Sequence, residues 1–434
     1  RCGDSECVQC WACHRCGRPA CAVCLACESL GRLRECDVIL SAAAPPLARP
    51  AVRVQPALPF SLTPAQADAS AALARAVAQG RRRGTAEHAE ADSRPDCLVW
   101  AACGAGKTEV SFGVVADALS AGRRVLFAVP RREVVRELGE RLRRAFPACA
   151  VQALYGGSEE RFDPSVGLTI ATAHQTLRFE GCFDLVILDE ADAYPYRDSH
   201  LLQRAVLRSR KPGGFLVYMT ATPEPAWLAA ARRGEMACVT IPARHHGHPM
   251  PVPEVFLDRA WSRRGRELAR PPFERLREAA GSGPWLVFVP AVATVEPVVA
   301  ALARLFGGRV AGTHGRDPDG AAKRARLAAG RLRVLVTTTV LERGVTIEGV
   351  QAAVLFADEE WVFDSRTLVQ IAGRVGRSGR APSGRVLFFA RRCTPAMRAA
   401  VEQIETLNDL ARRAGYLAAG PSASQRPPAG GGAG

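Results

Sequence analysis

The chain has 434 residues, of which 48% are hydrophobic and 23% charged, a composition typical of a globular protein with two or three domains. Its apolar runs fall well short of the roughly 20 residues that span a membrane, so we expect no transmembrane segment. A net charge of +15 favours a polyanionic partner, nucleic acid before an acidic membrane surface.

Cysteine is concentrated at the N-terminus, where nine of the 15 cysteines fall at or before Cys36. The other six are scattered, which indicates a reducing compartment, the cytoplasm, and favours metal binding over disulfide bonds. The first residues also lack the apolar stretch of a signal peptide.

Residues 1–40 are therefore predicted to form a zinc module. A C-x2-C turn places two thiolates on one side of a tight knuckle, and two knuckles complete a tetrahedral Zn²⁺ site. A second knuckle at Cys21 and Cys24 would follow the first after only four residues, so the spacing favours a later one. We expect the ligands to be Cys13, Cys16, Cys24 and Cys27. A second metal on Cys2, Cys7, Cys10 and Cys36 stays open.

Residues 41–59 are rich in Ala and Pro and are predicted to be a linker. A helix is expected from about Ala67 to Gln79, with Gln66 just before it. The amide of Gln66 can both donate to and accept from adenine, which makes it a candidate nucleotide contact.

A phosphate-binding loop follows the strand predicted at 97–101. Its glycines let backbone N–H groups point at an anion, Lys107 would reach the β- and γ-phosphates, and Thr108 would hold Mg²⁺. Ala101 stands where the usual motif has its first glycine. Only three of the 58 basic residues are lysines, and one of them is here, where a compact ammonium is required. The candidate phosphate ligands are Gly104, Ala105, Gly106, Lys107 and Thr108.

Strand and helix signals then alternate, which predicts a parallel sheet covered by helices. Strands are expected at 124–130, 166–172, 184–189 and 214–220. Asp189 ends the third of these and would orient the Mg²⁺ water shell, and Glu190 would activate the attacking water. Thr220 and Thr222 would sense the γ-phosphate or couple to a second domain.

Residues 242–253, with four prolines and a His trio, are predicted to be a hinge rather than a metal site. The alternation then resumes without a phosphate loop, with strands expected at 285–289, 309–313, 333–337, 352–356 and 385–389. Arg374 and Arg377 are three residues apart, so in a helix they would share one face and act as arginine fingers. Residues 417–434 are Ala, Gly, Pro and Ser-rich and are predicted to be disordered.

These motifs together resemble the superfamily-two helicases and translocases of the DEAD-box-like type. The elements of the resemblance are Gln66, GAGKT at 104–108, DEAD-like 189–192, TAT at 220–222 and QxxGRxGR at 370–377. With the cysteine module, AHQTLRF at 173–179 and TTTVLERGVT at 337–346, the chain resembles the ComFA family of late-competence ATPases most closely.

The resemblance implies an α/β fold with two RecA-like parallel-sheet lobes in tandem, at residues 60–241 and 254–416, with ATP and Mg²⁺ bound between them. It adds Gly344 to the nucleotide site and Gln370 to the residues that couple hydrolysis to movement. It also places six residues against the nucleic-acid backbone: Arg131, Thr172, His174, Thr313, His314 and Thr338. Thr346 stands where DEAD-box proteins keep an Asp near the ribose.

The expected function is an ATP-driven single-stranded DNA translocase that brings transforming DNA into the cytoplasm. Its expected cofactors are ATP, Mg²⁺ and Zn²⁺. Its expected partners are single-stranded DNA, a membrane DNA-channel protein and other late-competence proteins, with homo-oligomers and docking at the inner face of the membrane left open. The alternatives are a PriA-like replication-restart helicase and a non-motor adaptor that binds DNA through its zinc module.

Overall fold

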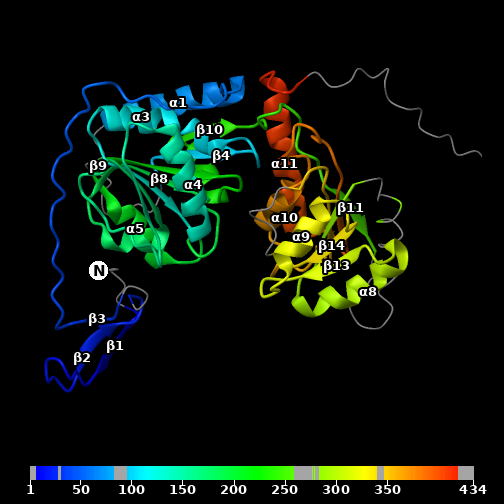
Figure 1. The fold of residues 1–434 in the computed structure, drawn as a ribbon, viewed down its shortest axis with the longest axis horizontal. Helices are drawn as coiled ribbons and strands as arrows, with labels where there is room; N and C mark the ends of the chain where they lie inside the picture. Colours follow the sequence, from blue (N-terminus) through cyan, green and yellow to red (C-terminus); the bar gives the residue numbers. More distant parts are fainter. Residues whose placement is uncertain are drawn as a thin grey trace, which may run out of the picture. The chain divides into compact units, whose positions relative to one another are not determined.

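The computed structural model describes residues 6–27, 31–82, 95–258, 276, 278, 283–339 and 347–418 (Figure 1). The chain divides into two compact units: Arg1–Ala101 with Gly106–Ile241, and Ala102–Ala105 with Pro242–Gly434. Gly344, Thr346 and the tail from residue 419 lie outside the described residues. Within the described residues, no helix has both the length and the apolar character needed to cross a membrane.

The cysteine module is a small antiparallel sheet in the order β1-β2-β3. Its strands are β1 (Val8–Trp11), β2 (Cys21–Cys24) and β3 (Leu33–Arg34). The pairing of β1 with β2 sets Val8 opposite Cys24 and Trp11 opposite Cys21. Since successive residues of a strand face opposite sides, Cys21 and Cys24 point to opposite faces of this sheet.

The first unit contains a seven-stranded sheet in the order β10-β4-β9-β8-β5-β7-β6. All its neighbouring strands are parallel, and the residues of β4, β5 and β7 are buried throughout, the pattern of strands covered on both faces. The strands are β4 (Cys97–Ala101), β5 (Val125–Val129), β6 (Val151–Leu154), β7 (Leu168–Thr172), β8 (Phe183–Asp189), β9 (Arg210–Thr220) and β10 (Ala237–Ile241).

Helices cover this sheet (Figure 1). Helix α1 packs on β4, β9 and β10, α4 packs on β5, β6 and β7, and α5 packs on β8 and β9. The helices are α1 (Pro64–Arg82), α2 (Lys107–Val110), α3 (Phe112–Ser120), α4 (Arg132–Ala145), η3 (Ala173–Arg178), α5 (His200–Ser209) and α6 (Pro225–Arg232). The predicted alternation of parallel strands and helices is thus confirmed.

The second unit contains a six-stranded parallel sheet in the order β11-β16-β15-β12-β14-β13. Its strands are β11 (Glu254–Leu257), β12 (Trp285–Phe288), β13 (Val310–Thr313), β14 (Val334–Thr337), β15 (Gln351–Leu355) and β16 (Val386–Ala390). Its helices are η4 (Val292–Thr294), α8 (Val295–Phe306), α9 (Gly320–Ala328), α10 (Ser365–Ala372) and α11 (Pro395–Arg413). A core that includes Trp285, Val298 and Leu302 joins α8 to the strands.

The segment predicted to be a hinge, 242–253, is hydrogen bonded to the second unit. Met250 donates its N–H to Asn408 Oδ1 at 2.9 Å, and Asn408 Nδ2 donates to the carbonyl of Met250 at 2.8 Å. Asn408 lies on α11 and is 5% exposed. This segment therefore has fixed partners within the second unit, of which it is part.

Candidate nucleotide and nucleic-acid site

The phosphate loop follows β4 and ends at Lys107, the first residue of α2. Lys107 Nζ lies 3.1 Å from Asp189 Oδ1, at the end of β8. Burial favours a lower pKa for Lys107, but the carboxylates of Asp189, Glu190 and Asp192 outweigh it and raise the pKa. The lysine is therefore a cation at physiological pH, as phosphate binding requires.

Thr108 and Asp189 are brought together at the same edge of the sheet. Thr108 Oγ1 lies 3.4 Å from Asp189 Oδ2, and the two residues are 7% and 5% exposed. A hydroxyl and a carboxylate oxygen are hard ligands of the kind Mg²⁺ prefers, with water and phosphate oxygens completing its octahedron. The residues present thus fit a Mg²⁺–nucleotide complex.

Glu190 has an unusual backbone conformation, with φ of 55°. Its N–H donates to Asp189 Oδ1 at 2.7 Å, and its carbonyl accepts from the N–H of Ala193 at 2.8 Å. A non-glycine residue in the left-handed region is uncommon and occurs often at functional sites. At Glu190 the backbone therefore turns away from the direction of β8.

Asp192 joins the end of β8 to the end of β9. Thr220 Oγ1 donates to Asp192 Oδ1 at 2.6 Å, and Thr222 Oγ1 donates to Asp192 Oδ2 at 2.9 Å. All three residues are at most 3% exposed. The threonine hydroxyls are therefore committed to Asp192, which favours the coupling role expected for Thr220 and Thr222 over direct sensing of the γ-phosphate.

Replacing Asp192 by Ala is expected to destabilise the first unit by about 3 kcal/mol, because two buried hydroxyls lose a charged acceptor. Denaturant unfolding measures the loss. The control is Asp198→Ala at a half-exposed side chain that pairs with Arg197, which should change stability by less than about 0.5 kcal/mol. Equal stability of the two variants would contradict the assignment.

Gln66 has a local structural role that the sequence analysis missed. Its Oε1 accepts from the N–H of Thr63 at 2.9 Å, and its own N–H lies 3.4 Å from Thr63 Oγ1, a capping box at the start of α1. A Cβ on Gly106 would lie 2.4 Å from Gln66 Nε2, and Gly106 has φ of +74°. Gln66 thus packs against the phosphate loop, and its contact with adenine stays a prediction.

The residues predicted to contact nucleic acid lie at strand ends in each unit. In the first, Arg131 follows β5, and Thr172 and His174 lie at and after the end of the neighbouring β7. In the second, Thr313 and His314 lie at the end of β13, and Thr338 follows the neighbouring β14. The threonines are buried, whereas Arg131, His174 and His314 are partly exposed. The latter three are the better placed to reach a ligand.

The expectation that Arg374 and Arg377 share one face of a helix is wrong. Helix α10 ends at Ala372, and Arg374 and Arg377 lie in and after the turn that follows. Gly376, with φ of +67°, takes a left-handed conformation that ends the helical path. Arg374 is 4% exposed, whereas Arg377 is partly exposed.

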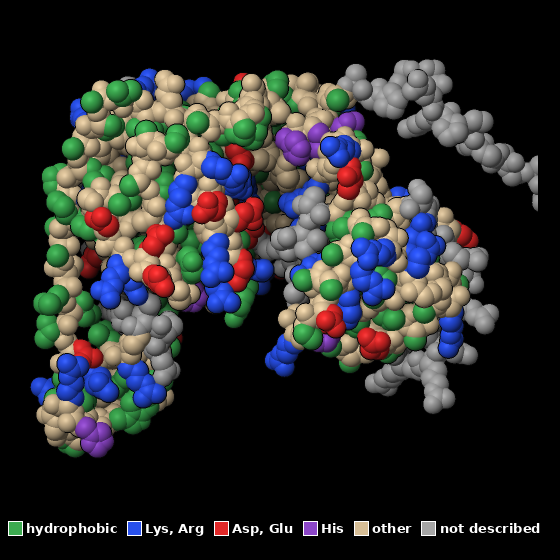
Figure 2. All heavy atoms as spheres, viewed as in Figure 1, with side chains coloured by type: hydrophobic (Ala, Val, Ile, Leu, Met, Phe, Trp, Pro, Cys, Tyr) green, Lys and Arg blue, Asp and Glu red, His purple; other side chains and the backbone are tan. Residues whose placement is uncertain are grey.

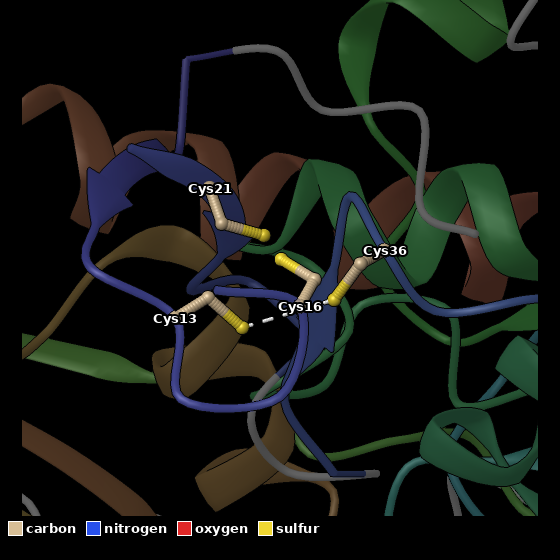
Figure 3. A group of neighbouring side chains, drawn as sticks. All are labelled: Cys13, Cys16, Cys21 and Cys36. Carbon is tan, nitrogen blue, oxygen red and sulfur yellow. Dashed lines mark hydrogen bonds between the residues drawn. The ribbon is translucent and has the colours of Figure 1, made fainter. Parts of the chain in front are cut away.

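Four thiols of the cysteine module form a group that could hold a metal ion: Cys13, Cys16, Cys21 and Cys36 (Figure 3). Their sulfur atoms all lie within 4.8 Å of one another, with Cys13 and Cys36 Sγ 3.8 Å apart. Thiolates about 2.3 Å from a zinc ion at the corners of a tetrahedron are about 3.8 Å apart. Hydrogen bonds from the backbone of Cys16 and Arg15 lower the pKa of Cys13 to about 6, whereas burial raises the pKa of Cys21 and of Cys36.

The predicted register is therefore corrected: Cys13 and Cys16 are kept, and Cys21 and Cys36 replace Cys24 and Cys27. The physical reason is the alternation along β2, which directs Cys21 to this group and Cys24 to the opposite face. The turn after β3 brings in Cys36, which follows β3 by only two residues. Cys24 and Cys27 are buried elsewhere in the module.

Family models match both units of the chain. Residues 59–225 match the type III restriction enzyme res subunit, and residues 272–379 match the helicase conserved C-terminal domain. The two matches together place the chain among the superfamily-two helicases.

Solved helicase structures share the fold. RecG bound to a three-way DNA junction aligns with a TM-score of 0.52 at 20% identity, over 82% of this chain and 47% of that one. Dbp5 of S. cerevisiae, bound to RNA and ADP BeF3, aligns with a TM-score of 0.50 at 18% identity, over 80% of this chain and 92% of that one. The expected RecA-like lobes are therefore confirmed.

Two curated relatives carry the same name. Competence protein ComFA of Bacillus subtilis is 39% identical over 74% of this chain and 69% of its own length. Competence protein ComFA of Streptococcus pneumoniae is 35% identical over 73% of each chain. With its two RecA-like lobes and a four-cysteine group, the chain belongs to the ComFA family of helicase-like competence proteins.

Proposed function

We propose that the chain is an ATP-hydrolysing motor that moves along single-stranded DNA and drives the uptake of transforming DNA. The observation that carries the proposal is the pairing of Lys107 and Thr108 with Asp189 at one edge of the first sheet. Asp192, three residues further on, is bonded to Thr220 and Thr222. This set offers a cation for phosphate, oxygen ligands for Mg²⁺ and a buried link to Thr220 and Thr222. A vestigial ATP site would have no reason to keep all of these groups.

Bound ATP would bring the reacting phosphate, and Mg²⁺ would neutralise its charge. Lys107 would hold the β- and γ-phosphates, while Thr108 and Asp189 would hold the metal and its water shell. Glu190 would orient the attacking water and accept its proton. Arg374 and Arg377 of the second unit would stabilise the charge of the transferring phosphoryl group.

Single-stranded DNA is the proposed track. In the first unit Arg131 and His174 follow the adjacent strands β5 and β7, and in the second unit His314 follows β13. These side chains can contact backbone phosphates. The net charge of +15 supports a polyanionic partner. Lys and Arg side chains are spread over the visible surface (Figure 2), and on the cysteine module Arg15 and Arg18 are 70% and 59% exposed.

The proposed cofactors are ATP, Mg²⁺ and Zn²⁺, with zinc held by the four-thiol group. The zinc module would be a rigid platform for DNA or for another competence protein. The proposed place of action is the cytoplasmic face of the cell membrane, beside a DNA-channel protein.

The test is steady-state ATP hydrolysis with single-stranded DNA, duplex DNA, forked DNA or RNA at one salt concentration. We expect single-stranded DNA to stimulate hydrolysis most, and Glu190→Gln to remove the activity, which excludes a contaminating ATPase. Preference for duplex or forked DNA would favour a replication-restart helicase. Absence of ATP hydrolysis, with DNA binding intact, would leave only the alternative of a non-motor adaptor that binds DNA through its zinc module.

A further inference from the structure

Arg244 is a buried cation in the segment that follows β10. It is 2% exposed, and its guanidinium donates to a set of backbone carbonyls rather than to a surface carboxylate. The acceptors are Val375 O and Gly376 O at 2.7 Å from Nη1, Gly373 O at 3.3 Å from Nη2, and Cys103 O at 3.1 Å from Nε. Three of these four carbonyls belong to the turn that carries Arg374 and leads into Arg377.

This turn needs an external donor because it follows the end of a helix. The last carbonyls of α10 accept from the N–H groups of Gly373, Arg374 and Val375. The carbonyls of the turn itself lie beyond the helix, so no continuing helix supplies donors to them. A cation near a helix C-terminus also complements its partial negative charge. The planar, multiply donating guanidinium can bind several carbonyls at once, which a lysine ammonium cannot do with the same geometry.

The turn is also closely packed at Gly376. A Cβ on Gly376 would lie 2.3 Å from the carbonyl oxygen of Pro382 and 3.1 Å from Arg244 Nη1. Pro382 and the guanidinium therefore leave no room for a side chain at this position of the turn.

His246 adds a second donor to the same carbonyl. Its Nδ1 accepts from the N–H of His248 at 3.1 Å, so Nε2 carries the proton and donates to Gly376 O at 3.0 Å. Burial, Arg244 and His245 lower the pKa of His246 to about 4, so the ring is neutral at physiological pH. His246 thus supports the turn through Gly376 O.

We propose that Arg244, assisted by His246, is a positioning residue that fixes the turn that carries Arg374 and leads into Arg377 during ATP hydrolysis. Burying a guanidinium without a carboxylate is costly, and an apolar residue would fill the same space at lower cost. A role in holding the arginine-finger turn explains why a cation is kept here. The inference rests on the proposed function for the role of Arg374 and Arg377.

The test compares the ATP kinetics of Arg244→Met, Arg244→Lys, Arg377→Met and the double variant Arg244→Met/Arg377→Met with those of the full-length wild type. We expect Arg244→Met to lower kcat by about 10²-fold while the KM for ATP changes by less than about threefold, because only the transition state loses stabilisation. Arg244→Lys should recover part of the loss. The double variant should be no slower than Arg377→Met alone, since the two residues act as a unit.

The matched control is Arg385→Met, which removes an exposed pair with Glu254 in the same unit and should leave kcat unchanged. A folded Arg244→Met protein with wild-type kcat would overturn the inference. So would a double variant whose loss of kcat equals the product of the losses in the two single variants. If Arg244→Met fails to fold, Arg244→Lys and His246→Ala provide the same comparison with Arg377→Met.

Failure of the proposed function is recognised separately. It would appear as a wild type without ATP hydrolysis under any nucleic-acid condition. Amide hydrogen exchange of residues 373–377 then decides whether Arg244 fixes the turn: faster exchange in Arg244→Met supports the positioning role, and equal exchange overturns it.

Discussion

Replacing Lys107 by Met is expected to lower the kcat of ATP hydrolysis by about 10²–10³-fold, the loss typical of removing one preorganised charge partner from a transition state. The lysine is the only cation that the described structure places on Asp189. Without it, the phosphate loop offers only backbone N–H groups to the phosphates. The change is measured as single-stranded-DNA-stimulated phosphate release at saturating ATP.

Lys211→Met is a closely matched control for this variant. Lys211 Nζ lies 2.9 Å from Asp184 Oδ2, and Asp184 and Asp189 lie near opposite ends of the same strand, β8. Both variants therefore replace a lysine that is paired with an aspartate of β8, but only one is at the phosphate loop. We expect Lys211→Met to keep its kcat within about twofold of the wild type.

A loss of folding has to be separated from a loss of chemistry, since Lys107→Met leaves the buried Asp189 without its cation. Lys107→Arg keeps the positive charge but replaces a compact ammonium by a wider planar group. We expect this variant to fold and still to hydrolyse ATP slowly. Activity close to wild type in Lys107→Met would remove the phosphate loop from the proposed mechanism.

The parts of the fold that depend on local sequence were predicted well. The strands predicted at 124–130 and 184–189 each contain an apolar run, with helices between them, and the structure places them as neighbouring parallel strands β5 and β8. The phosphate loop and Asp189 meet because both follow strands of one sheet, with β9 between those strands. Short-range pattern and the rules of parallel sheets are sufficient for this arrangement.

The strands that lack such a pattern were missed. No strand was predicted at β6, β10 or β11, which have four or five residues each and lie at the edges of their sheets. Edge positions tolerate polar residues, so their sequences differ little from those of loops. Their pairing depends on neighbours that are distant in sequence.

Contacts between residues that are distant in sequence could not be predicted either. The spacing between Arg374 and Arg377 fits one face of a helix. The structure instead has a turn, and its Gly376 carbonyl accepts a hydrogen bond from Arg244, 132 residues away. Asp192 was visible as part of a DEAD-like motif, yet only the structure shows that Thr220 and Thr222 both donate to it. Spacing identifies a motif, whereas burial and partners assign its contacts.

Removing zinc is expected to unfold the cysteine module and leave the two sheets of the lobes intact. The described part of the module has few buried apolar residues besides its cysteines, with Val23 at 5% exposed among them. A core of this size contributes little stability, whereas structural zinc sites contribute about 10–16 kcal/mol at neutral pH. Zinc content and circular dichroism after treatment with a strong chelator measure the effect.

Cys36→Ser tests the ligand set most sharply, because the register predicted from C-x2-C spacing leaves Cys36 out of the site. The structure places Cys36 Sγ 3.8 Å from Cys13 Sγ, so this variant should lose one equivalent of zinc per chain. Cys238→Ser, on the exposed face of β10, is the control and should keep the wild-type zinc content. Full zinc retention in Cys36→Ser would restore the earlier register, with Cys24 and Cys27 as ligands beside Cys13 and Cys16.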